Sequence, residues 1–141
     1  PSALYGERCV SRRVGQIFIE NLVSNKEIGI NGDGEDKLDF TYIDDFIDGI
    51  EKCCTNPNAI NQTFNLTYGS SRPIIDLIKI LENNFDNIKL VKKPREDFMP
   101  ERGTLDIAKA KDLINFQPQY PIEIGYQKYI NWYKEFFNKV L

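Results

Sequence analysis

Apolar residues recur every three or four positions in several segments of the chain, and this spacing predicts amphipathic helices. Ser11 is the candidate N-cap of the first helix, which should end near Asn25. Ser71, with Pro73 in the first turn, starts the third helix, and Asp106 caps the short fourth helix, which runs through residue 113. The apolar faces of the four longer helices are Val14, Ile17, Phe18 and Leu22; Phe46, Ile47, Ile50 and Cys54; Ile74, Leu77, Ile78, Leu81 and Phe85; and Tyr126, Tyr129, Ile130, Tyr133 and Phe137.

Short β-branched and aromatic runs between turn residues predict strands at 28–30, 38–42, 63–66 and 88–91. A glycine turn at 32–34 separates the first two strands. Asp44 and Asp45 then fall in the first turn of the second helix, where the helix dipole favours carboxylates. A loop follows the last strand, from Lys92 to Thr104. The alternation of strands and helices predicts a single α/β domain.

Composition and charge narrow the classes of function. With 41% hydrophobic and 28% charged residues the chain suits an ordinary globular domain. A formal net charge of -3 and a pI near 5.1 argue against nucleic acid as a partner. Between Lys89 and Arg102, however, five basic residues outnumber three acidic ones. An anionic ligand is therefore expected near that stretch.

Cysteine and histidine usage argues against two further classes. Three cysteines without suitable spacing, and no histidine, fit neither a disulfide framework nor a metal site. No signal peptide or membrane-spanning apolar run is visible in the sequence. We therefore expect reduced thiols, a cytoplasmic location, and no membrane partner or bound metal.

The most distinctive stretch is GDGEDKLDFTYIDD, from Gly32 to Asp45. It resembles the G-D-G-x-x-x-R-D-F-x-x-V-D-D block of nucleotide-sugar epimerases and dehydratases in the extended short-chain dehydrogenase/reductase family. Further segments resemble the same family in the same order. They are SALYGER from Ser2, FNL from Phe64 with Gly69, DIAKAK from Asp106 with FQP from Phe116, and Trp132-Tyr133.

The resemblance implies that residues 1–141 are the C-terminal, nucleotide-sugar-binding part of an NAD(P)-dependent epimerase or dehydratase. Most of the Rossmann domain is then missing, so we expect the chain to be a fragment. Residues 1–8 and about 43–67 are expected to pack on that absent domain.

The same resemblance implies a set of substrate-binding residues. Arg13, Val14 and Gln16, on the first helix, correspond to positions that face the nucleotide. Ile30 and Asn31 fall where the family lays a residue against the base. Asn31 offers hydrogen bonds but cannot stack as the usual aromatic residue does.

The diphosphate needs a cationic partner, and the family's R-D-F arginine is Leu38 in this chain. Lys37 should point to the opposite face of a regular strand. Arg102 and Arg95 are the remaining candidates, because a guanidinium makes paired bonds to phosphate oxygens. The alternative, that these two arginines only keep a long loop in solution, stays open.

The family's catalytic pair is a tyrosine followed four residues later by a lysine, which lowers the tyrosine pKa. None of the seven tyrosines here has a lysine at that spacing. The glycines from Gly29 to Gly34 precede acidic residues and a strand, whereas a dinucleotide cradle needs a helix N-terminus. We therefore expect NAD or NADP to bind only in the intact enzyme. The chain alone should have no catalytic or cofactor-binding residues and no activity.

Three departures from the family pattern favour an alternative of another class: Asn31, Leu38 and Ala3, the last of which replaces an asparagine that touches substrate in many relatives. It is a non-catalytic binding or regulatory module that kept the fold. For the intact enzyme the resemblance implies a homodimer that binds a nucleotide-diphosphate sugar. The chain by itself is expected to self-associate, because lost packing would expose Phe46, Ile47, Ile50, Phe64 and Leu66.

Overall fold

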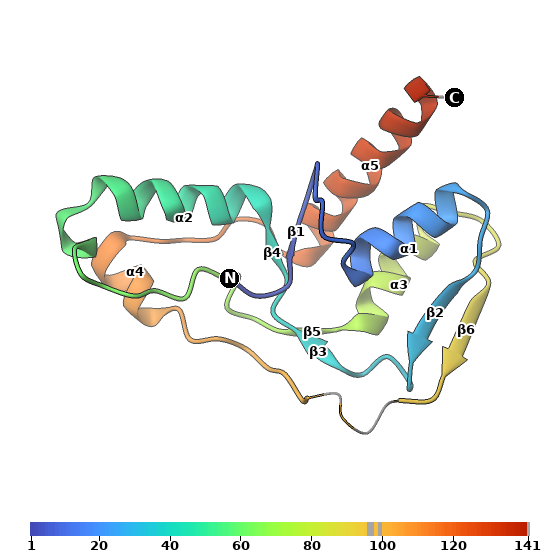
Figure 1. Ribbon diagram of the computed structural model, residues 1–141, viewed down its shortest axis with the longest axis horizontal. Helices are drawn as coiled ribbons and strands as arrows, with labels where there is room; N and C mark the ends of the chain where they lie inside the picture. The colour runs from blue at the N-terminus through green and yellow to red at the C-terminus, as the bar shows by residue number, and fades with distance from the viewer. Residues whose placement is uncertain (96–97, 99, 141) are drawn as a thin grey trace.

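Helices and short strands alternate along the chain in the computed structural model, which describes residues 1–95, 98 and 100–140 (Figure 1). This alternation confirms the predicted α/β class. The helices are α1 (Val14–Val23), α2 (Ile43–Thr55), α3 (Ile74–Glu82), α4 (Ala108–Ile114) and α5 (Ile122–Val140), with a 3-10 turn η1 (Pro57–Ala59). The strands are β1 (Leu4–Tyr5), β2 (Ile28–Asn31), β3 (Lys37–Leu38), β4 (Thr41–Tyr42), β5 (Arg72–Pro73) and β6 (Leu90–Lys93).

The elements form two ends joined by a central region (Figure 1). Helices α2 and α4 lie at one end, and strands β2 and β6 lie at the other. Helices α1 and α3 both pack on α5, whose C-terminal part projects beyond the rest of the molecule. None of the helices in the described part of the chain has the length and apolar character needed to cross a membrane.

The strands pair two by two. β1 runs parallel to β4, with Tyr5 opposite Tyr42. β2 runs parallel to β6, with Ile28 opposite Leu90 at one end and Asn31 opposite Lys93 at the other. β3 and β5 are antiparallel. Parallel pairs join segments that are distant in sequence, so each of these pairs links two parts of the chain.

The main core lies where α1, α3 and α5 meet the strands. The buried stripe of α5 includes Tyr126, Tyr129 and Ile130, each of which is 0% exposed. Leu77, Ile78 and Leu81 of α3 pack in the same cluster. The tyrosine stripe of the last helix is therefore core, as its helical spacing predicts.

A second, smaller core lies between α2 and α4. Leu66, Ala110, Ile114 and Phe116 are buried there, with Phe46 and Phe64 packed against them. The sequence places Phe64 and Leu66 on an apolar face that should be exposed. That expectation is wrong for Leu66, which is 5% exposed, and for Phe64, which is half-buried, because α4 and Phe116 cover this segment. It is wrong for Phe46 of α2 as well, which is half-buried against the same cluster.

Three predicted helix starts are wrong. Ser11 is not the N-cap of α1. That position belongs to Arg13, and the Ser11 hydroxyl instead accepts a hydrogen bond from Arg13 Nε at 3.2 Å. Helix α3 begins after Pro73 rather than at Ser71, because Arg72–Pro73 form β5. The N-cap of α4 is Ile107 rather than the predicted Asp106, although the Asp106 Oδ1 accepts the Ala108 N–H at 2.8 Å.

The predicted strands also differ from the observed ones. Segment 38–42 is two strands, β3 and β4, which pair with different partners. Segment 63–66 is not a strand, since no neighbouring segment among the described residues pairs with it. The last strand lies two residues later than predicted, at Leu90–Lys93, in register with β2. The predicted loop therefore begins later than Lys92, and residues 96, 97 and 99 lie outside the described residues.

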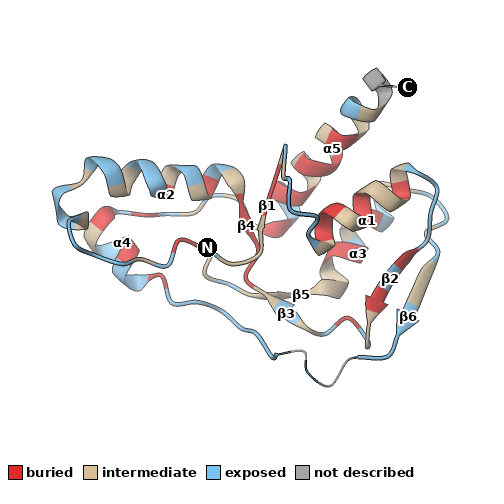
Figure 2. Cartoon of the chain, viewed as in Figure 1, coloured by how far each residue is buried: buried red, intermediate tan, exposed pale blue. Residues whose placement is uncertain are grey.

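Helix α2 presents a different face inward from the one predicted. Its buried residues are Asp45 and Gly49. Ile47 and Ile50 remain 55% and 44% exposed, and Cys54 is exposed as well. Figure 2 shows most of α2 as exposed or intermediate. The apolar residues of α2 do recur with helical spacing, but within the described chain the core contacts the neighbouring stripe that contains Asp45 and Gly49.

Candidate functional site

The end of β2, directly before the glycine turn, holds two of the predicted substrate-binding residues. Ile30 is buried, and Asn31 is the last residue of the strand. Gly32 and Gly34 adopt left-handed φ angles of 63° and 88°, which glycine tolerates without strain. The Gly32 N–H bonds to the Lys93 carbonyl at 2.7 Å. Asn31 therefore lies on a turn that is fixed against β6.

Arg95 lies beside the same turn. The Arg95 Cβ lies 3.5 Å from the position that a Cβ on Gly32 would occupy. Its Nε donates to both carboxylate oxygens of Asp36, at 3.1 and 3.2 Å. The structure therefore brings Ile30, Asn31 and Arg95 together, although Arg95 comes from a segment far along the chain.

Arg102 is exposed and lies in the segment that leads to α4. Two residues later, the Thr104 hydroxyl accepts the Ser71 N–H at 2.9 Å and donates to the Ser71 hydroxyl at 2.9 Å. The Leu105 N–H donates to Asp39 Oδ2 at 3.1 Å. The segment that carries Arg102 is thus anchored directly after it.

The other three predicted residues lie at the start of α1. Arg13 is exposed, and Val14 is half-buried against the main core. Gln16 is buried, and its Nε2 donates to Glu20 Oε1 at 2.8 Å. The neighbouring Gly15 packs on α5 and α3, so this turn is held by the core. Only Arg13 of the three presents a fully exposed side chain, and the roles of all three remain predictions.

Two buried carboxylates of the GDGEDKLDFTYIDD block were not assigned a role from the sequence. Asp39 is 0% exposed and accepts hydrogen bonds from Thr67, Gly69 and Leu105. Asp45 is 3% exposed. The signal in the sequence is an acidic residue inside an apolar run, since a buried charge needs several donors to offset its lost hydration.

Asp45 links α2 to the segment before α5. Its two carboxylate oxygens accept the backbone N–H groups of Gln119, at 2.6 Å, and Tyr120, at 3.0 Å. Burial raises the pKa of Asp45, while these two backbone hydrogen bonds oppose the rise. The carboxylate therefore serves as a cap for residues 119 and 120.

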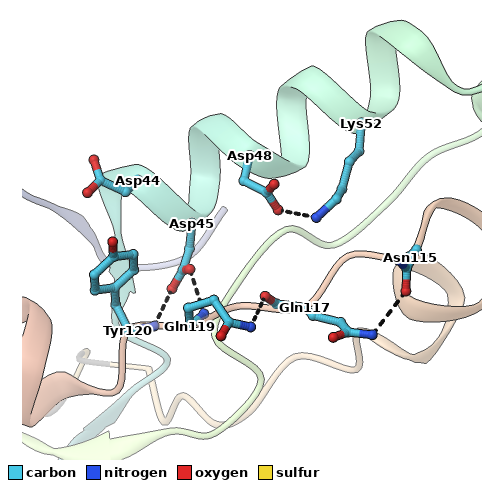
Figure 3. A pocket seen from close by; sticks show the side chains of 8 residues that line it. All are labelled: Asp44, Asp45, Asp48, Lys52, Asn115, Gln117, Gln119 and Tyr120. Atoms are coloured by element: carbon cyan, nitrogen blue, oxygen red, sulfur yellow. Dashed lines mark hydrogen bonds and ion pairs between the residues drawn. The ribbon is translucent and has the colours of Figure 1, made fainter.

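A hollow of about 340 Å³ lies between α2 and this segment (Figure 3). Its one lysine, Lys52, is paired with Asp48 at 2.6 Å. A diphosphate would be repelled by the carboxylates here, so the hollow is not the anion site. It also lies at the end of the molecule away from β2 and β6 (Figure 1). The lining residues are Asp44, Asp45, Asp48, Lys52, Asn115, Gln117, Gln119 and Tyr120.

The glycine turn does not fit a dinucleotide. Gly32 and Gly34 connect β2 to β3, and no helix N-terminus follows them directly. Asp33, Glu35 and Asp36 lie on the turn, and Asp33 Oδ1 accepts the Glu35 N–H at 3.0 Å, so a carboxylate already occupies this donor. No group of metal-binding side chains occurs in the part of the chain that the structure describes.

Comparison with known proteins places these features in a family. The family model described as "NAD dependent epimerase/dehydratase family" matches residues 1–67. The chain is 32% identical over 126 residues to the UDP-glucuronate 4-epimerase of Thermodesulfobacterium geofontis. That match covers 84% of this chain and 36% of the relative.

Solved structures show the same fold. The chain superimposes on the epimerase Mth375 of Methanothermobacter thermautotrophicus with a TM-score of 0.90 and 24% identity, covering 99% of this chain and 43% of that one. It superimposes on the UDP-glucuronic acid 4-epimerase of Bacillus cereus, solved with UDP-glucuronic acid and NAD, with a TM-score of 0.87 and 25% identity. That match covers 96% of this chain and 44% of the other.

The chain spans well under half the length of the curated relatives it matches, 36–42% for three of them. Its fold corresponds to a part of theirs, which confirms the expectation of a partial domain. On the sequence match, the relatives and the shared fold, the chain belongs to the NAD-dependent epimerase/dehydratase family of the extended short-chain dehydrogenases/reductases.

Proposed function

We propose that this chain is the nucleotide-sugar-binding part of an NAD(P)-dependent epimerase or dehydratase. The observation that carries the proposal is the match over 96% of the chain to an epimerase structure that holds UDP-glucuronic acid and NAD. In the intact protein this part would hold the nucleotide diphosphate, so that the sugar reaches the cofactor. Binding energy away from the reacting carbon then aids the chemistry through orientation.

The base would lie near the turn after β2. Ile30 and Asn31 line this turn, and Arg13, Val14 and Gln16 would contribute from α1. The Asn31 amide offers both donors and acceptors to the edge of a base. Arg95 lies beside Gly32, the residue after Asn31, which supports a diphosphate next to the base.

Arg95 and Arg102 are the proposed diphosphate ligands. Leu38, at the position of the family's arginine, packs against the main core and has no charge to offer. Arg95 already pairs with Asp36, so a phosphate would compete with that carboxylate for the guanidinium. Arg102 is exposed on an anchored segment and is therefore the stronger candidate of the two.

The surfaces of α2 and β1 are where the dinucleotide-binding domain would pack. β1 and β4 form a parallel pair of two residues each, whereas parallel sheets are normally larger and covered on both faces. Ile47 and Ile50 of α2 are exposed. In the proposed intact enzyme, residues 1–8 and about 43–67 pack on the Rossmann domain. That domain would supply the catalytic tyrosine and lysine, and the chain alone would be inactive.

A second candidate is a binding or regulatory module without catalysis. The pairing of Arg95 with Asp36 favours it, together with the loss of the family's arginine at Leu38. Both observations indicate a weaker anion site than an active enzyme needs. The two functions differ in affinity for a nucleoside diphosphate.

Calorimetry with UDP, uridine and NAD on the chain tests the proposal. We expect UDP to bind more tightly than uridine, and NAD not to bind stoichiometrically. Arg102→Ala should weaken UDP binding by about 1.5–3 kcal/mol, the range for a hydrogen bond to a charged group. Equal affinities for UDP and uridine would favour the non-catalytic module, and tight NAD binding would refute the assignment of this part of the enzyme.

A further inference from the structure

The carboxylate of Asp39 joins three segments that are far apart in the sequence. Its Oδ1 accepts the Gly69 N–H at 3.0 Å. Its Oδ2 accepts the Thr67 hydroxyl at 2.9 Å and the Leu105 N–H at 3.1 Å. The side chain is 0% exposed, so these neutral donors replace the water that a carboxylate loses on burial. Such a group can hold its neighbours in place only while all its acceptor sites are available.

The segment bound by Asp39 is tied at neighbouring residues as well. Thr104 exchanges two hydrogen bonds with Ser71. The Asp106 carbonyl accepts the Asn65 side-chain amide at 2.9 Å. Three consecutive residues, 104–106, are therefore fixed to the body of the molecule. The tie at Leu105 is made by the side chain of Asp39, which is 0% exposed.

We propose that Asp39 is a positioning residue for Arg102, the guanidinium assigned to the diphosphate. The inference rests on the proposed function and deepens it. Arg102 precedes Leu105 by three residues, so the anchor limits its Cα to within about 10 Å of the Leu105 Cα. A side chain held near its bound position loses less conformational entropy when the anion arrives. Asp39 thus acts on the anion through Arg102, without touching it.

Asp45 provides a matched control. It is also a buried aspartate, it also accepts backbone N–H groups, and it lies in the same sequence block. Its partners, Gln119 and Tyr120, precede α5 and do not belong to the segment that carries Arg102. Loss of either carboxylate should reduce stability, but only loss of Asp39 should release Arg102.

The binding experiment compares Asp39→Asn, Asp45→Asn, Arg102→Ala and the double variant Asp39→Asn/Arg102→Ala. The asparagine NH₂ cannot accept, so Asp39 loses part of its anchor. UDP and uridine are titrated into each by calorimetry. We expect Asp39→Asn to lower the preference for UDP over uridine by about tenfold, the size of one charge-assisted bond. Arg102→Ala should do the same, and the double variant should lose no more than either. Asp45→Asn should keep the preference of the unmodified chain.

A second measurement needs no ligand. Trypsin cleaves after arginine, so cleavage of the folded chain after Arg102 reports how firmly its segment is held. We expect faster cleavage at Arg102 in Asp39→Asn than in Asp45→Asn at matched stability. If Asp39→Asn does not fold, Thr104→Val replaces it, because it removes the neighbouring tie to Ser71 from an exposed position.

The outcomes separate the two proposals. Unchanged UDP preference and unchanged cleavage in Asp39→Asn, or in Thr104→Val in its place, would overturn the positioning role. Equal effects of Asp39→Asn and Asp45→Asn on the UDP preference would also overturn it, since both would then act through stability. If Arg102→Ala leaves UDP binding unchanged while Asp39→Asn speeds cleavage, the diphosphate assignment of Arg102 fails, and the positioning of an anion ligand fails with it.

Discussion

The hydroxyl of Tyr126 donates a hydrogen bond to the Gly15 carbonyl at 2.8 Å and so joins the middle of the molecule to the first turn of α1. Tyr126 is 0% exposed. Its ring atom Cε2 lies 3.1 Å from the position that a Cβ on Gly15 would occupy. This turn carries Arg13, Val14 and Gln16. The contact between α5 and α1 therefore sets the position of three of the five proposed base-binding residues.

Replacing Tyr126 with phenylalanine should destabilise the chain by about 1–2 kcal/mol, because one buried hydrogen bond is lost and the packing is kept. Urea unfolding followed by circular dichroism measures the change. Tyr68→Phe is the control, since Tyr68 is only partly buried and its change should be within about 0.5 kcal/mol. Equal effects of the two variants would contradict the structural role of the Tyr126 hydroxyl.

The acid stability of the chain should depend on Asp76. Burial alone would raise the Asp76 pKa, but hydrogen bonds from Lys79 and Arg72 outweigh it and hold the pKa below its usual 3.8. Because the folded pKa is the lower one, the contribution to stability is complete above about 3.8. It is lost as the pH falls through the folded pKa.

This pH dependence is measured by urea unfolding from about pH 5 down to about pH 2. Asp76→Asn should remove part of the fall in unfolding free energy over that range. Asp86→Asn serves as the control, because Asp86 is an exposed residue on the loop after α3. A pH profile of Asp76→Asn parallel to that of the unmodified chain would show that Asp76 does not carry this dependence.

Backbone strain at Ala3 should be relieved by glycine. Ala3 has a φ of 40°, in the left-handed region that disfavours residues with a Cβ. Ala3→Gly should therefore stabilise the chain by up to about 1 kcal/mol, despite the greater freedom of glycine when unfolded. Ala108→Gly, at the exposed start of α4, should destabilise by up to about 1 kcal/mol. Thermal unfolding of both variants gives the comparison, and a loss of stability in Ala3→Gly would contradict strain at this position.

The exposed apolar residues of α2 should make the isolated chain self-associate. Ile47 and Ile50 lie on α2, which directly follows β4, and apolar surface together with open strand edges favours association. Light scattering over a concentration series should show a rising mass. Ile47→Lys/Ile50→Lys should reduce it, whereas Ile124→Lys, an exposed position on α5, should not. A strictly monomeric chain at high micromolar concentration would refute the expectation.

Several features of this protein follow from the sequence by itself. The apolar spacing in α3 and α5 identifies Leu77, Leu81 and the tyrosine stripe as core, because a helix with one apolar face has a single way to bury it. The order of short motifs indicates the family, and the match to the family model confirms it. Both kinds of information lie along the chain and need no knowledge of distant contacts.

Tertiary contacts decided the rest. Segment 38–42 divides into β3 and β4 because Asp39, between them, is held by donors 28, 30 and 66 residues away. Arg95 lies beside Gly32, the residue after Asn31, because β2 pairs with β6, and the exposure of Ile47 depends on which surfaces reach α2. A local pattern can show that a residue needs a partner. Which distant residue becomes that partner is determined by the packing of the whole chain, because pairing energies between strands and buried polar groups arise only after the segments meet.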